Sequence, residues 1–187
     1  MNTTRRSLAA GALALVATAG PLAVTAAHAQ DRDRMAARGL ATLHHLEAIN
    51  PRSRYYARHA QAVLVFPSIL KAGFVFGAQS GNGVLLIGGR PAGYYNLTGG
   101  SWGLQVGAQD FSYVLFFMTP GALHYLRDTA GFSAGTGPSI TIINQGGAAV
   151  ANTQTVGSDV YAFPFNGRGL MADLTLQGTK ITRIDPR

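Results

Sequence analysis

From Ala62 onward, short apolar runs alternate with glycine-rich segments, and this pattern limits the possible folds more than any other feature of the chain. The runs are rich in Val, Phe, Tyr and Thr, which favour strands, and 24 glycines and eight prolines supply turns between them. With 47% hydrophobic and 12% charged residues, the 187-residue chain is too apolar to be disordered and long enough for one compact domain. A helical bundle would need more Glu, Lys and Leu. We therefore expect a β-rich domain.

Period-two patterning places the individual strands and the turns between them. A run that is apolar on both faces, Tyr113–Met118, predicts a buried central strand. The other expected strands are Ala62–Phe66, Phe74–Gln79, Val84–Gly88, Gly93–Thr98, Trp102–Gln109, Ile140–Asn144, Ala148–Thr153, Val160–Phe165 and Leu170–Leu176. The expected turns are Ser80–Gly83, with Asn-Gly inside it, Gly88–Ala92 and Thr98–Ser101.

Residues 31–62 form the extended helical stretch. Asn50-Pro51 divides it, because an Asn cap followed by proline starts a second helix that we expect to run to about Gln61. A third, short helix is expected over Pro120–Asp128. The predicted fold class is α+β: a curled antiparallel sheet or partial barrel of short strands, with N-terminal amphipathic helices and one short internal helix.

The first 29 residues have the layout of an export signal. Arg5 and Arg6 precede an apolar stretch, Leu8–Val24, and Ala27-His28-Ala29 fits the small-x-small cleavage rule. We expect a signal peptide over 1–29, cleaved before Gln30 and of the twin-arginine-like or general secretory type, and a single domain over 30–187. The alternative is a retained anchor, although Gly20-Pro21 leaves the stretch short of the ~20 residues that a span needs. The expected location is outside the cytoplasm, in the periplasm.

Charge and cysteine content restrict the partners. Cleavage would leave 13 Lys and Arg against eight Asp and Glu, a net charge of +5, which favours anionic partners. Outside the cytoplasm these are lipid headgroups and surface polyanions rather than nucleic acid. The chain has no cysteine, so it has no disulfide, thiolate metal site or cysteine nucleophile.

The helical stretch is the candidate binding site. Its apolar and basic residues fall on opposite sides of a helical wheel, as in helices that lie in a membrane interface. The candidate lipid-binding residues are Arg32, Arg34, Arg38, Leu40, Leu43, Leu46, Ile49, Arg52, Arg54 and Arg58. The alternative is a docking helix, whose apolar face packs on the sheet while its arginines face water.

Two other motifs carry less weight. Gly99-Gly100-Ser101-Trp102-Gly103 matches the G-x-S-x-G elbow of hydrolases, but that motif needs a following helix, and here a strand is expected. His44-His45 cannot chelate one metal together, because adjacent helical residues do not face each other. We therefore expect no enzyme activity, no cofactor and no metal.

Several blocks of the chain, in order over about residues 35–184, resemble the SYLF domain family. The Trp-Gly-Leu-Gln block is the most specific of them, and Asp173 departs from the pattern where a glycine is expected. The matching blocks are Ala62–Pro67, Ala72–Gly77, Gly81–Gly83, Tyr94–Asn96, Ser101–Gln109, Phe116–Met118, Gly169–Ala172 and Leu176–Ile181.

The resemblance implies phospholipid binding, since the bacterial branch of the family is lipid-binding and is related to yeast actin-binding proteins. It also implicates the basic N-terminal segment, which by position is Arg32 to Arg58. We expect reversible, peripheral association with anionic phospholipids such as phosphatidylglycerol or cardiolipin, and no transfer of actin bundling. The alternative function is a non-enzymatic cell-envelope interaction or scaffolding module that binds protein or glycan.

Overall fold

The computed structural model describes most of the chain after its first 20 residues. The described residues are 21–73, 76–102, 107–128, 131–133, 137–144, 147–150, 157–167, 169–171, 176 and 178–185.

Three helices and ten strands make up the described fold. The helices are α1 (Pro21–Ile49), α2 (Ser53–His59) and α3 (Pro120–Asp128). The strands are β1 (Ala62–Gly73), β2 (Phe76–Ile87), β3 (Arg90–Trp102), β4 (Gly107–Phe117), β5 (Phe132–Ser133), β6 (Ile140–Asn144), β7 (Gly147–Val150), β8 (Val160–Asn166), β9 (Gly169–Leu170) and β10 (Thr179–Ile184).

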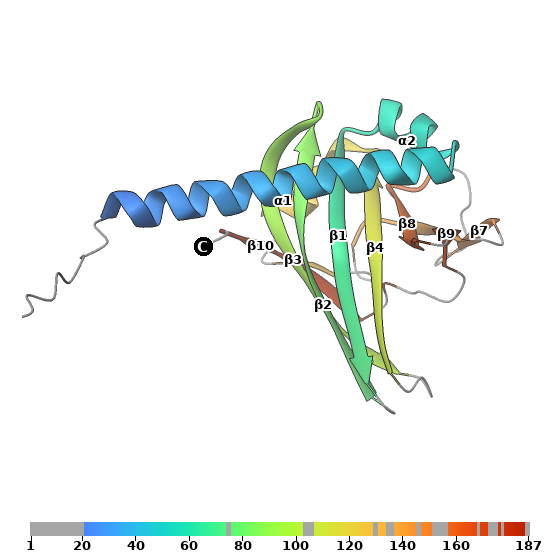
Figure 1. Cartoon of the computed structure of the whole chain (residues 1–187). Coiled ribbons are helices and arrows are strands. Elements are labelled where there is room, and N and C mark those ends of the chain that lie inside the picture. The colour runs from blue at the N-terminus through green and yellow to red at the C-terminus, as the bar shows by residue number, and fades with distance from the viewer. Residues whose placement is uncertain are drawn as a thin grey trace, which may run out of the picture.

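All ten strands belong to one sheet, which curls into a half-barrel (Figure 1). The strand order is β5-β10-β3-β2-β1-β4-β8-β6-β7, and β9 pairs with β8. Neighbours are antiparallel except β6 and β8, which are parallel. The predicted α+β class is confirmed, and α3 occupies the expected residues, 120–128.

The central strands are apolar on both sides because both faces of the sheet are covered. Along β4, Tyr113, Leu115 and Phe117 enter a core cluster on the α3 face of the sheet. The residues between them, Val114 and Phe116, enter a second cluster under α1 and α2. All five are completely buried, which confirms the prediction of a buried central strand.

The long central strands correct the prediction of short ones. The Ser80–Gly83 turn is wrong, because these residues lie inside β2. A Cβ on Gly81 would stand 2.5 Å from the carbonyl oxygen of Ser68, and one on Gly83 would stand 2.6 Å from the Phe66 ring. The pairing register of β1 shifts at this point, between Val65 and Leu70. The two glycines therefore make room for an irregularity in β1 instead of turning the chain.

That irregularity also explains why β1 continues past Pro67, where a strand end was expected. A bulge accommodates the missing N–H of proline. The carbonyl oxygen of Pro67 accepts a hydrogen bond from Ser112 Oγ at 2.8 Å, and Ser68 Oγ donates to Asp110 at 2.8 Å. Side chains of β4 thus replace part of the interrupted ladder.

The turn expected at Thr98–Ser101 is wrong as well, because all four residues lie within β3. A Cβ on Gly99 would stand 3.0 Å from Thr179 Oγ1, so this glycine allows a close approach of β10. The turn expected over Gly88–Ala92 is confirmed only at Gly88 and Gly89, because Arg90–Ala92 already lie in β3. These two glycines have φ of 57° and 75°, the left-handed pair typical of a two-residue hairpin.

The C-terminal strands also differ from expectation. Of the strand expected over Leu170–Leu176, Leu170 lies in β9 and residues 172–175 lie outside the described residues, while β10 was not expected. In β10, only Thr179 and Ile181 are buried, too few for the apolar pattern to signal a strand. Asp173 and residues 103–106, which include Gly103 to Gln105 of the Trp-Gly-Leu-Gln block, lie outside the described residues.

Candidate functional site

The first helix docks on the sheet through its apolar stripe. Leu43 and Leu46 are buried in the cluster that contains Val63, Val65 and Val84, and Leu40 packs beside it. The prediction that Leu43 and Leu46 are available to a bilayer therefore does not hold for this arrangement. Burial of a leucine side chain contributes roughly 1.5–3 kcal/mol, so the sheet competes strongly with lipid for this stripe.

Gly39 sets how closely α1 approaches the sheet. A Cβ on this residue would stand 2.2 Å from Val84 Cγ1, closer than any real contact. The glycine that weakens the helix in sequence terms is therefore the point where α1 touches β2. Figure 1 shows α1 crossing the upper part of β1 to β4, with its N-terminal end running past them.

Among the described residues, Leu70 on β1 is an exposed large apolar side chain, and two others lie at the corner between α1 and α2. Ile49 ends α1 and is 40% exposed, and Tyr55 in α2 is 61% exposed. The Tyr55 ring lies 4.3 Å from the His59 ring, centroid to centroid. Asn50 shapes the corner, since its Oδ1 accepts from the Arg52 backbone N–H at 3.1 Å. Tyr55 was missing from the predicted site, because a seven-residue helix shows too little periodicity to reveal its outward face.

The arginines of both helices face outward, apart from one. Arg34 has 67% of its side chain exposed, and Arg38, Arg52, Arg54 and Arg58 are exposed as well. Arg32 is the exception: it is half-buried and pairs with Asp185 at the end of β10. Its carbonyl oxygen accepts from Tyr94 Oη at 3.2 Å, so Arg32 fastens α1 to β3 and β10.

Acidic partners neutralise only part of this charge. Arg34 lies 3.8 Å from Asp31 across one turn of α1. Among the described residues, no carboxylate lies within 4.0 Å of the other four outward arginines, which are Arg38, Arg52, Arg54 and Arg58. Exposed and unpaired guanidinium groups remain available to phosphate oxygens.

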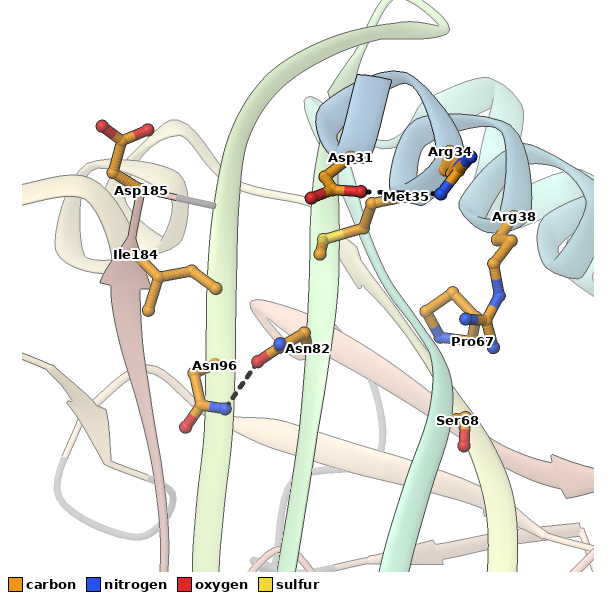
Figure 2. A pocket seen from close by; sticks show the side chains of 10 residues that line it. All are labelled: Asp31, Arg34, Met35, Arg38, Pro67, Ser68, Asn82, Asn96, Ile184 and Asp185. Atoms are coloured by element: carbon orange, nitrogen blue, oxygen red, sulfur yellow. Dashed lines mark hydrogen bonds and ion pairs between the residues drawn. The ribbon is translucent and has the colours of Figure 1, made fainter. Parts of the chain in front are cut away.

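Two of the grooves that α1 borders lie where the helix crosses the sheet. The first, of about 790 Å³, lies under the N-terminal half of the helix and is lined by Asp31, Arg34, Met35, Arg38, Pro67, Ser68, Asn82, Asn96, Ile184 and Asp185 (Figure 2). The second, of about 520 Å³, lies between α1, α2 and the upper ends of β1 and β2. It is lined by Leu43, Glu47, Arg54, Ala57, Arg58, Ala60, Gln61, Ala62, Val63, Leu86, Gly88 and Gly89. Sequence reasoning missed the strand residues of both grooves, because they are distant from the helices along the chain.

The structure describes only part of the remaining sequence candidates. His44 and His45 are exposed on α1, and the side chain of Ser101 lies outside the described residues. Within the described part of the chain, no three His, Asp or Glu side chains cluster as metal ligands would. None of the described helices combines the length and the apolar character that crossing a bilayer requires.

The fold and the site together define a class of protein: an α+β domain with a basic surface that contains grooves. Residues 98–185 match the family described as Ysc84, Las17-binding protein actin regulator. The predicted resemblance to the SYLF family is confirmed by this match over residues 98–185. The family is associated with lipid binding and is generally non-catalytic. No curated protein matches the chain.

The family match begins inside β3 and ends just after β10. It therefore covers the C-terminal half of the sheet and α3. The basic helices α1 and α2 precede the matched residues, so their role is argued from their own geometry.

Proposed function

We propose that the chain associates reversibly with anionic phospholipid surfaces through the basic face of α1 and α2. The observation that carries this proposal is the set of outward arginines, Arg38, Arg52, Arg54 and Arg58, without carboxylate partners among the described residues. Each basic side chain near an anionic bilayer contributes about 1 kcal/mol of attraction at low ionic strength. Four such residues are enough for reversible, salt-sensitive binding.

The apolar contribution is assigned to the corner between the helices. Ile49 and Tyr55 are exposed beside Arg52 and Arg54, whereas Leu43 and Leu46 are covered by the sheet. Tyrosine has a polar hydroxyl group and an apolar ring, so it suits the headgroup region of a bilayer. In this proposal α1 stays docked, and the corner enters the interface only to a shallow depth.

The docked helix also fits the second candidate function. An envelope interaction module that binds protein or glycan needs rigid helices, and the name of the matched family refers to a protein partner, Las17. Actin regulation is not part of either proposal.

Vesicle flotation separates the two functions. The protein is mixed with phosphatidylglycerol vesicles or with neutral phosphatidylcholine vesicles at low salt. We expect flotation with the anionic vesicles alone, and its loss on raising the salt. Absence of binding to anionic vesicles at low salt would overturn the lipid proposal and leave the interaction module.

Matched charge reversals locate the contact. Arg54→Glu with Arg58→Glu should weaken flotation at least about tenfold, from the loss of about 1 kcal/mol per residue plus new repulsion. Arg127→Glu with Lys180→Glu makes the same change in net charge at exposed positions on α3 and β10. This control pair should retain most of the binding. Equal losses in both pairs would mean that net charge, rather than this surface, drives binding.

The proposal also includes export of the protein from the cytoplasm. A signal peptide over residues 1–29 would place the domain in the periplasm, facing membrane surfaces. Cleavage before Gln30 retains the docking residues Gly39, Leu43 and Leu46. The mass of the protein recovered from the periplasm tests this, with a mature chain starting at Gln30 as the expected result and an intact N-terminus as the contrary one.

A further inference from the structure

The groove under the N-terminal half of α1 has a polar floor that the arginine face does not explain. The helix supplies Arg34, Arg38 and Asp31 along one wall. Strands β1, β2 and β3 supply Ser68, Asn82 and Asn96 to the floor, as Figure 2 shows. Met35, Pro67 and Ile184 complete the lining with apolar surface.

The two asparagines leave one NH₂ group and one carbonyl oxygen unused. Asn96 Nδ2 donates to Asn82 Oδ1 at 2.7 Å and to the Gly81 carbonyl oxygen at 3.3 Å. Both hydrogens of that amide are then used, and within the described residues Asn96 Oδ1 and the Asn82 NH₂ group have no partner. Ser68 Oγ gives its hydrogen to Asp110 and presents lone pairs. The floor can therefore both donate and accept hydrogen bonds.

The charges along the wall are likewise of both signs. Arg38 has no carboxylate within 4.0 Å among the described residues, and Arg34 shares its charge with Asp31 at 3.8 Å. An inorganic anion would bind to the arginines but would not donate hydrogen bonds to the acceptors of the groove, Asn96 Oδ1 and Asp31. A group that carries a phosphate and, a few bonds away, a hydrogen-bond donor would satisfy both sets.

The groove wall is held in place on two sides. Arg32 pairs with Asp185, which follows β10, and Tyr94 on β3 donates to the Arg32 carbonyl oxygen at 3.2 Å. These contacts fix the helix over the floor, so the groove does not need to be created by the ligand. A preformed polar site loses less conformational entropy on binding.

We infer that this groove binds a glycerophosphodiester headgroup whose terminal group donates hydrogen bonds, with the phosphate at Arg34 and Arg38 and the donor at Asn96 Oδ1 and Asp31. Glycerol and ethanolamine headgroups satisfy this chemistry, and choline, which has no donor hydrogen, does not. The inference rests on the proposed function and adds recognition of the headgroup to it.

The test uses soluble headgroups, so that it is independent of vesicle binding. Glycerophosphoglycerol, glycerophosphoethanolamine, glycerophosphocholine and inorganic phosphate are titrated into ¹⁵N-labelled protein, and the side-chain amide signals of Asn82 and Asn96 are followed by NMR. The Gln109 amide, exposed on β4, is the control signal. We expect the two donor headgroups to shift the asparagine signals and to bind at least about fivefold more tightly than glycerophosphocholine or phosphate, as expected for one hydrogen bond.

Two variants sharpen the result. Asn96→Ala should remove the preference over glycerophosphocholine while leaving the weak phosphate binding at the arginines. Arg54→Glu with Arg58→Glu, which weakens vesicle binding in the proposed function, should leave the titration unchanged. Equal affinity for all four compounds, or shifts that spare Asn82 and Asn96, would overturn the inference even if the vesicles bind. Failure of vesicle flotation with intact headgroup titration would instead count against the proposed function alone.

Discussion

At the scale of single residues, Asp159 connects three segments of the domain. Its carboxylate accepts from Thr119 Oγ1 at 3.0 Å, from Ser139 Oγ at 2.8 Å and from the Ser139 backbone N–H at 3.0 Å. Burial alone would raise the pKa of Asp159, but these hydrogen bonds outweigh it and hold the pKa below its ordinary value of 3.8. The charged form is therefore the one that stabilises the junction of α3, β6 and β8.

The sign of the pH dependence follows from that lowered pKa. Its contribution is complete above the unfolded value near 3.8 and is lost as the pH falls through the lower, folded value. We expect Asp159→Asn to lower the free energy of unfolding at pH 7 by about 1–3 kcal/mol, since hydrogen bonds to a charged group are weakened.

Urea unfolding at pH 7 and at pH 3 checks this expectation. The difference between the wild type and Asp159→Asn should shrink at the lower pH, where the wild-type carboxyl begins to take up a proton. A difference that stays constant or grows on acidification would show that the charge of Asp159 does not stabilise the fold.

Only some of the residues that form the candidate site can be predicted from the sequence. It placed the arginines on the solvent side of the helices, because a 3.6-residue period determines which residues share a face. It did not give the floor residues Asn82 and Asn96, which meet α1 only through the pairing of β2 with β3. It also interpreted Gly81 as a turn residue, since local chemistry does not distinguish a turn glycine from one required by a bulge in the neighbouring strand.

At the scale of elements, the contact between α1 and β2 controls whether the helix is docked. The period of the apolar residues predicted an amphipathic helix, and two interpretations of it, membrane insertion and docking, remained open. The structure favours docking, because Val84 and its neighbours already cover Leu43 and Leu46. The choice depended on the shape of the sheet, which a local pattern does not contain.

A double-mutant cycle tests that contact. Gly39→Ala should be destabilising or neutral, as overpacking costs of about 1–3 kcal/mol oppose a gain in helix propensity of about 1 kcal/mol. In a Val84→Ala background the clash is gone, and the same change should be more favourable by at least about 1 kcal/mol. Thermal or urea unfolding of the four proteins gives the coupling.

Gly121→Ala provides the control for that cycle. It makes the same substitution in α3 at a position with open space around it. Its effect should not depend on Val84. Additive effects of Gly39→Ala and Val84→Ala would contradict the docked arrangement, and increased vesicle binding by Gly39→Ala would show that α1 must leave the sheet to bind lipid.

At the scale of the whole molecule, the α+β class followed from the sequence, but the size and order of the sheet did not. The shift from helical to period-two patterning near Ala62 placed the helices before the strands correctly. The strands that close the sheet come from distant parts of the chain: β10 pairs with β3, and β6 lies parallel to β8. Such pairings depend on long-range packing rather than on local periodicity.

The arrangement of surfaces follows from this topology. The α1 and α2 face carries the outward arginines and the exposed corner, while α3 covers the opposite core cluster. Membrane contact through the first face would leave the second in water. The proposed binding is therefore directional: the face of α1 and α2, with its exposed corner, meets the bilayer while the α3 side stays in water.

A fluorophore sensitive to polarity tests this claim most directly. The chain has no cysteine, so Tyr55→Cys and His124→Cys each give a single labelling site, the first at the corner and the second exposed on α3. With phosphatidylglycerol vesicles at low salt, we predict a blue shift and brightening of the label at position 55 and no change at position 124. No response at position 55, or equal responses at both positions, would contradict the account.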